Sequence, residues 1–165
     1  MNSKKGFTLI ELLIVIAIIA VLAVAFSPTI LGAPAKGRDT ARVAALQKIQ
    51  KVVVSANLDG KSYPSTGCVT TGFGGATDSA YYLAALGGAL PVDPQTDNVL
   101  PTVTCKGQYY FKMNPDSPAT NYKFGVYAHA ENASTNTFSC ADAYTGKLTL
   151  NSTAGTDLCF AVLTQ

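Results

Sequence analysis

The sequence predicts an α+β protein in which a long amino-terminal helix packs on an antiparallel β-sheet. Three observations predict this fold. Residues 7–26 are an apolar run that contains a single charged side chain. Residues 39–58 carry apolar side chains at spacings of three and four, as an amphipathic helix does. Beyond residue 106, short runs rich in tyrosine, phenylalanine and valine alternate with polar turns, which is typical of strands. We therefore expect a helix whose first half spans a membrane and whose amphipathic second half covers the sheet.

Length and charge limit the possible function classes. The chain has 165 residues, enough for one domain and an anchor. Its net charge of +2 includes Lys4 and Lys5 of a short polar leader, residues 1–6. Beyond that leader, ten basic side chains equal ten acidic ones. This balance does not indicate nucleic-acid binding.

The apolar run has the length of a membrane span. Twenty residues make a helix of about 30 Å, the thickness of the hydrocarbon layer of a bilayer. Glu11 is the exception within it. A charged side chain at the bilayer centre costs about 2.5–3.5 kcal/mol even on lenient scales, and glutamate is too short to reach the surface easily. We therefore expect Glu11 to have a specific ion-pair partner.

The residues around the start of this run identify a processing signal. The leader ends in Gly6, and Gly6-Phe7-Thr8-Leu9-Ile10-Glu11 follows directly. This arrangement resembles the signal of type IV pilins and of the pseudopilins of type II secretion. The resemblance implies a type IV pilin-like fold, cleavage by a prepilin peptidase between Gly6 and Phe7, and methylation of the new amino terminus. It also implies that Glu11 serves assembly into a homo-oligomeric helical filament at an inner-membrane assembly platform.

The spacing of Phe7 and Glu11 explains how the acid could serve assembly. After cleavage Phe7 carries a cationic amine, and Glu11 lies four residues on, on the same helix face. In a bundle of staggered chains, the amine of one copy would meet Glu11 of its neighbour in an apolar core, where the attraction is strong. One polar pair in an apolar bundle sets the register of adjacent helices.

A second interpretation treats the same residues as a general secretory signal. Lys4 and Lys5, the apolar run and the small residues at 23–25 are typical of such signals. Cleavage after them would release a soluble domain. The run exceeds the usual apolar region of about 7–15 residues, and an acid inside it argues against this alternative.

Helix breakers follow the apolar run, so we predict a kinked linker at residues 27–38. Pro28 matches the position at which the resembled family carries a helix-kinking proline, and a proline removes one helical hydrogen bond. Gly32, Pro34 and Gly37 interrupt the helix more densely than the family normally does.

An amphipathic helix is expected at residues 39–58. Asp39 is a candidate cap, and Asp59-Gly60 ends the helix. Its apolar stripe should face the sheet and comprises Val43, Leu46, Ile49, Val53 and Ala56, whereas Arg42, Lys48 and Lys51 are expected on the solvent side.

The remaining residues, 59–165, should form a globular domain of helix, loop and antiparallel sheet. We predict a short helix at 79–86, a loop at 90–94 that resembles a pseudopilin loop, and strands at 108–112, 121–130, 147–151 and 158–163. Alternation in the second strand places Phe124, Val126 and Ala128 on a buried face and Gly125, Tyr127 and His129 on the other. A meander packed on the helix follows from these strands.

The chain has four cysteines, and no two of them are spaced as C-x-x-C, which argues against a structural zinc site. Disulfides form in an oxidising compartment, so the globular domain is expected outside the cytoplasm, although the lysines and arginines flanking the apolar run leave its orientation ambiguous. Four cysteines allow three pairings. We expect pairing in order, Cys68 with Cys105 and Cys140 with Cys159; the second pair resembles the carboxy-terminal disulfide of many type IV pilins.

No enzymatic or metal site is expected. His129 is the only histidine, and we interpret it as exposed rather than catalytic. Asp93, Asp97 and Asp116 do not have the spacing of a calcium loop, so we interpret them as solvated turn acids and expect no cofactor. Asn132 and Asn151 begin glycosylation-type triplets, which are common.

The expected function is that of a structural subunit of a type IV pilus-like filament, which serves adhesion, motility or DNA uptake. The alternative is a pseudopilin of a type II secretion system. The carboxy-terminal cysteines favour the pilus, and the loop at 90–94 favours the pseudopilin. A tethered single-pass domain that never polymerises is a third possibility.

Overall fold

The computed structural model describes residues 6–70, 72–100, 103, 105–113, 123–132, 137–140 and 158–164, with the backbone alone at 27–31. The chain divides into two compact units, Met1–Ala35 and Lys36–Gln165. Four predictions lie outside the described residues: the leader segment 1–5, the strand at 147–151, Asp116 and the triplet at Asn151.

Helix α1 runs from Leu9 to Leu58 and includes the residues that we predicted as a linker. Residues 27–38 are helical in the structure. A proline removes only one helical hydrogen bond, so a long helix can pass through isolated prolines with local distortion. The kink at Pro28 itself stays a prediction.

In the second unit, α1 contributes one wall of the core. Leu46, Ile49, Val53 and Ala56 are completely buried, which confirms four positions of the predicted apolar stripe. Val43, the fifth, is partly buried and packs against the same core. The helix ends as the sequence Asp59-Gly60 predicts. Gly60 has φ of +75°, its N–H donates to the carbonyl of Asn57, and the N–H of Lys61 donates to the carbonyl of Ala56. These two bonds form a Schellman motif, in which glycine is favoured because φ is positive.

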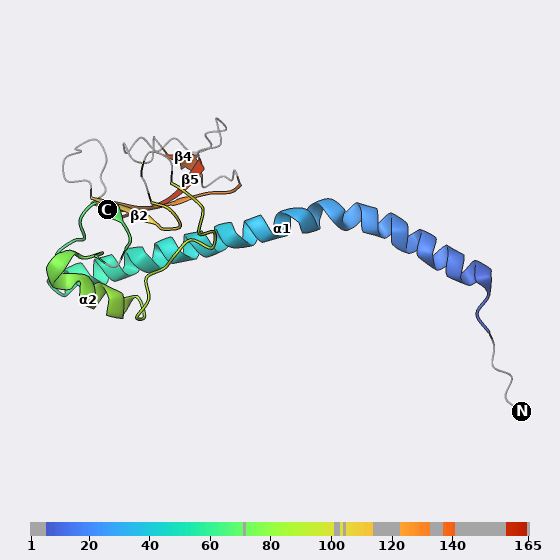
Figure 1. Ribbon diagram of the computed structural model, residues 1–165, viewed down its shortest axis with the longest axis horizontal. Coiled ribbons are helices and arrows are strands. Elements are labelled where there is room, and N and C mark those ends of the chain that lie inside the picture. Colours follow the sequence, from blue (N-terminus) through green and yellow to red (C-terminus); the bar gives the residue numbers. More distant parts are fainter. Residues whose placement is uncertain are drawn as a thin grey trace, which may run out of the picture. The chain divides into compact units, whose positions relative to one another are not determined.

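Among the described residues of this unit, a second helix and a five-stranded antiparallel sheet accompany α1 (Figure 1). Helix α2 spans Gly75–Ala85 and begins four residues before the predicted short helix. The strands are β1 Gly67–Cys68, β2 Tyr110–Met113, β3 Phe124–His129, β4 Phe138–Ser139 and β5 Leu158–Thr164.

The order of the strands differs from the expected meander. It is β1-β2-β3-β5-β4, so β5 pairs with β3 on one side and with β4 on the other. All neighbouring pairs are antiparallel. The local alternation of apolar and polar residues predicts which segments are strands. It does not specify which strand neighbours which, because that depends on contacts between distant residues.

Both faces of the sheet are covered. On one face, Phe124, Val126 and Ala128 pack with the apolar stripe of α1. On the other face, Tyr127 packs in a second cluster that contains Cys105, Cys140 and Cys159, with Cys68 against it. Gly125 and Tyr127 are buried as well, so the prediction that only the face of Phe124, Val126 and Ala128 is buried was wrong. The residues of this second cluster cover the second face of the sheet.

The second face leaves no room for a side chain at position 125. A Cβ built on Gly125 would lie 2.7 Å from Cζ of Tyr127 and 2.9 Å from a methyl carbon of Leu163. Tyr127 is fully buried and therefore has little space to move away.

We predict that Gly125→Ala lowers the free energy of unfolding by about 1–3 kcal/mol, because the added methyl group overpacks this cluster. Urea unfolding of the full chain in detergent measures the change. Gly72→Ala is the matched control, since a Cβ there meets nothing within 4 Å. Equal midpoints for the two variants would contradict the packing described.

Candidate assembly site

The first turn of α1 is closed by a capping box between Thr8 and Glu11. The hydroxyl of Thr8 accepts a hydrogen bond from the backbone N–H of Glu11 at 3.3 Å. In return, Oε2 of Glu11 accepts from the backbone N–H of Thr8 at 2.8 Å and from its hydroxyl at 2.7 Å. Thr-x-x-Glu is the sequence signature of this reciprocal cap, a signal that our sequence reasoning missed. The cap fixes the direction of the carboxylate at the start of the helix.

Only one oxygen of that carboxylate is used. Both bonds from Thr8 reach Oε2, and no hydrogen bond from the described part of the chain reaches Oε1. Phe7 precedes the helix and is 82% exposed. The chain therefore holds Glu11 in place and leaves one carboxylate oxygen available to another group.

The residues that follow present a continuous apolar surface. Leu9–Phe26 is long and apolar enough to cross a membrane, with a mean hydropathy of 3.2, and none of it is buried in the protein. The large side chains along it, from Leu9 to Phe26, are about half exposed or more. Such a surface is stable only in lipid or against other apolar helices.

A separate cluster of charged side chains lies in the second unit around Arg42, which is completely buried. Its guanidinium binds Asp93 with two parallel hydrogen bonds, Nε to Oδ2 at 2.7 Å and Nη2 to Oδ1 at 2.8 Å. Its Nη1 donates to Asp39 at 2.7 Å and to Glu131 at 2.5 Å. Arg38 also binds Glu131, with Nε at 2.8 Å. The cluster joins α1 to the loop before residue 95 and to the end of β3.

The charges in this cluster stabilise one another. Two guanidinium groups face three carboxylates, and unpaired burial of any of them would be costly. Hydrogen bonds from Arg38 and then Arg42 lower the pKa of Glu131 to about 2, although burial acts in the opposite direction. Asp39 accepts further bonds at 3.0 Å from the backbone N–H groups of Glu131 and Asn132.

Three predictions fail at this cluster. Arg42 is buried rather than on the solvent side of the helix. Asp39 lies inside α1 and binds residues 131–132, so it is not a helix cap. Asp93 is 4% exposed and is not a solvated turn acid. A signal was present, because Arg42 lies four residues before Leu46 and so continues the apolar stripe.

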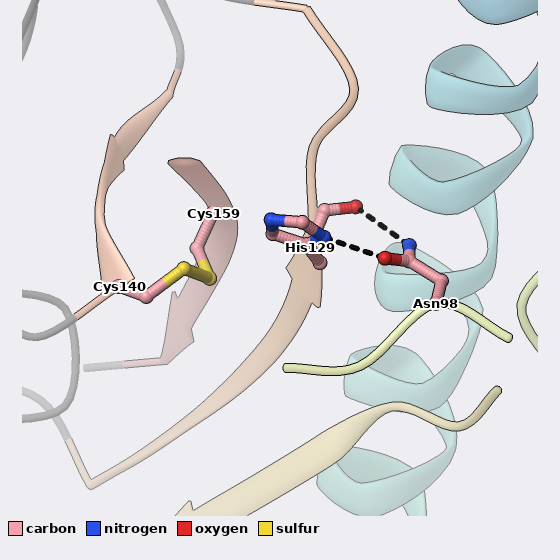
Figure 2. Close-up of a disulfide and its surroundings, with 4 residues drawn as sticks. All are labelled: Asn98, His129, Cys140 and Cys159. Atoms are coloured by element: carbon pink, nitrogen blue, oxygen red, sulfur yellow. Dashed lines mark hydrogen bonds between the residues drawn. A yellow bond between two sulfur atoms is a disulfide. The ribbon is translucent and has the colours of Figure 1, made fainter. Parts of the chain in front are cut away.

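The other candidate residues occupy different surroundings. Asp97 is 87% exposed at its side chain and forms an ion pair with Lys106 at 2.8 Å. His129 is partly buried, and its Nδ1 lies 2.5 Å from the side-chain oxygen of Asn98. Figure 2 shows the His129 ring directed toward Asn98. In the described residues, no group of three potential metal ligands comes together.

The cysteines form the two disulfides that we predicted. Cys68 is bonded to Cys105, and Cys140 to Cys159 (Figure 2). The first bridge joins β1 to the segment before β2, and the second joins the residue after β4 to β5. Each edge strand of the sheet has only two residues and is held by a disulfide. Short, tethered edges limit unwanted pairing with other chains.

Comparisons with known proteins cover only part of the chain. Residues 1–27 match the family model described as a prokaryotic N-terminal methylation motif. The type IV wide pilus major component PilA4 of Thermus thermophilus is 48% identical over 65 residues, which are 39% of this chain and 50% of the relative. The chain thus matches about half the length of that relative. No solved structure matches the chain.

We predict that Thr8→Val frays the first turn of α1, because it removes the hydroxyl that caps the helix, at a cost of about 1 kcal/mol. Amide hydrogen exchange at residues 9–12, measured by NMR on the full chain in detergent, should become faster. Thr8→Ser keeps the hydroxyl and serves as control. Unchanged exchange in Thr8→Val would show that the cap does not hold this turn.

We predict that the charge cluster makes the fold sensitive to acid through Glu131. Its folded pKa of about 2 lies below the ordinary value of 4.5. The stabilisation is therefore complete above pH 4.5 and is lost as the pH falls toward 2, with a size of about 2 kcal/mol. Urea unfolding at pH 7, 4 and 2.5 should show a smaller acid-induced loss in Glu131→Gln than in the native chain.

The control for this experiment is Asp59→Asn, which changes an exposed acid just after α1. It should retain the acid dependence of the native chain. An equal loss of stability on acidification in Glu131→Gln and the native chain would show that this carboxylate does not contribute.

Proposed function

We propose that this chain is a type IV pilin, a structural subunit of a pilus-like filament; the methylation motif matched at residues 1–27 and the similarity to a pilus component support this. One observation carries the proposal: an exposed apolar helix begins with a carboxylate, held by Thr8, whose Oε1 accepts no hydrogen bond from the described residues. An apolar helix can be stored in lipid as a monomer. The same surface can pack against copies of itself once the chain leaves the membrane.

Processing is the first step of the proposed route. A prepilin peptidase cleaves between Gly6 and Phe7, and the new amino terminus at Phe7 is methylated. Both residues are exposed and precede the first residue of α1, which supports access of a peptidase to the bond between them. The methylation motif matched at residues 1–27 supports the same step.

Assembly then depends on Glu11 and the amine that cleavage creates. In the filament, the amine of Phe7 in one subunit binds Glu11 of its neighbour. The hydrogen bonds from Thr8 to Oε2 support this pairing. They orient the carboxylate before the amine of the neighbouring subunit arrives, and they leave Oε1 to accept a hydrogen bond from it. Two opposite charges attract more strongly among apolar helices than in water. A subunit whose Glu11 stays unpaired in the filament core is therefore unstable in that position.

Location follows from the anchor and the cysteines. The precursor spans the inner membrane through residues 9–26, with the leader on the cytoplasmic side and the globular domain outside. Two disulfides in the domain support an oxidising compartment. The proposed partners are other copies of the chain, the peptidase and an inner-membrane assembly platform.

The pilus is favoured over the pseudopilus of a secretion system. The Cys140–Cys159 bridge supports the pilus, because it resembles the carboxy-terminal disulfide of many type IV pilins. The relative that matches 65 residues is named as a pilus component. A surface filament of this kind would serve adhesion, motility or DNA uptake.

We predict that Glu11→Ala is inserted in the membrane and trimmed at Phe7 but does not form filaments, because the incoming amine has no counter-charge. Shearing of cell-surface fibres, followed by microscopy and immunoblotting, measures assembly. Membrane fractionation and amino-terminal sequencing measure insertion and processing. Asp97→Ala, which removes an exposed acid of the second unit, should assemble normally.

Two results would contradict the proposal. Filaments of Glu11→Ala in normal amount would exclude the ion pair as the basis of assembly. A mature chain that begins beyond residue 25 would show that the apolar helix is removed rather than retained.

A further inference from the structure

A groove lies on the second unit beside the charge cluster. It has a volume of about 610 Å³ and is lined by the loop of residues 94–99 and by His129. This volume falls within the range of about 300–1,000 Å³ that is typical of small-molecule sites. The proposed assembly function uses none of these residues.

The loop that forms the groove is held in one conformation from several directions. Asp93, at its start, is bound by the buried Arg42, and its Oδ1 accepts from the N–H of Gln95 at 2.8 Å. Asn98, near its end, donates to Asp93 at 3.2 Å and accepts from His129. Gly107 donates to the carbonyl of Asn98 at 2.7 Å. A loop held in this way loses little conformational entropy when a ligand binds.

Close packing against Gly107 also holds the loop of residues 94–99 in place. Gly107 has φ of +63°, and a Cβ there would lie 2.7 Å from the carbonyl oxygen of Thr96. Only glycine fits this approach. The loop therefore rests directly on the backbone that precedes β2.

The residues that line the groove carry polar groups that form no hydrogen bond with the described part of the protein. Oε1 of Gln95 lies 3.3 Å from Nη2 of Arg42. Arginine only donates, so the oxygen of Gln95 must face it and the Gln95 amide nitrogen is turned away. Within the described chain, neither this nitrogen nor the hydroxyl of Thr96 has a hydrogen-bond partner. Asp97 adds an exposed carboxylate.

The charge and the apolar part of the lining restrict the ligand further. Lys106 neutralises Asp97 at 2.8 Å, so the groove does not favour a strongly charged ligand. Pro94 and Val99, which is 47% exposed, supply apolar surface between the polar groups. A saccharide matches this combination, because its hydroxyls pair with carboxylate, amide and hydroxyl groups while its C–H faces pack on apolar side chains.

We propose that the groove formed by residues 94–99 and His129 binds a neutral saccharide. Gln95 donates to it, Thr96 both donates and accepts, and Asp97 accepts from adjacent hydroxyls. Pro94 and Val99 contact the face of the sugar ring. The site is separate from the assembly helix and needs no second copy of the chain.

The test is an NMR titration of the full, isotope-labelled chain in a zwitterionic detergent without a sugar headgroup. The probes are lactose, cellobiose, N,N′-diacetylchitobiose and mannobiose, with N-acetylneuraminic acid as a charged comparison. We expect saturable shifts of the Gln95 side-chain amide and of the backbone amides of residues 96–98 with at least one neutral disaccharide, and weaker shifts with the acid.

Variants connect the binding to the groove. Thr96→Val should weaken binding roughly tenfold, since one hydrogen bond is lost and a polar group of the sugar is left unpaired. Asp97→Asn should weaken it as well. Thr77→Val is the matched control, because Thr77 is exposed on α2, and it should bind as the native chain does.

Two outcomes would overturn the proposal. The first is the absence of a saturable shift at residues 95–98 with all four neutral disaccharides. The second is equal affinity in Thr96→Val and the native chain, with native spectra elsewhere. Filament formation is measured separately on cells, so a failure of saccharide binding leaves the proposed structural function as it stands.

Discussion

One helix has to be stable in two different environments, and the rest of the structure depends on this constraint. Residues 9–26 of α1 expose apolar side chains all round, which suits lipid or a bundle of like helices. Beyond residue 42, apolar side chains occupy one face and the core of the sheet domain covers them. The Thr8–Glu11 cap and the Schellman motif at Gly60 satisfy polar backbone groups at the two ends of this helix.

The Arg42 cluster holds the second half of that helix to the loops that reach it. Its three carboxylates come from residues 39, 93 and 131, which are widely separated in the sequence. A buried arginine with such partners is unfavourable when any partner is missing, so the cluster favours a single arrangement of helix, loop and strand. The bonds from Arg42 to Asp93 also hold the loop that lines the groove proposed to bind a saccharide, so the shape of that groove depends on the cluster.

Local patterns in the sequence predict much of this architecture. The apolar stripe Leu46, Ile49, Val53 and Ala56 and the strands around Tyr110, Val126 and Phe160 follow from periodicity, which each segment carries by itself. The position of β5 and the burial of Gly125 and Tyr127 do not, because they depend on which distant segments cover the sheet. The prediction that Arg42 faces solvent was wrong because it relied on the charge of the residue and not on its position in line with the apolar stripe. The groove could not be predicted, since it needs Asn98 and His129 side by side.

The strand order has a consequence for the time at which the domain can fold. Among the described strands, β4 pairs with β5 alone, and β5 lies between β4 and β3. Until residues 158–164 have been synthesised, the edge of β3 that pairs with β5 is open, and Cys140 lacks its partner Cys159. The bridge at Cys68 is independent of this delay, because Cys105 has already emerged. During synthesis from the amino terminus, the residues of the first bridge are therefore present early, and the strand that completes the described sheet is made last.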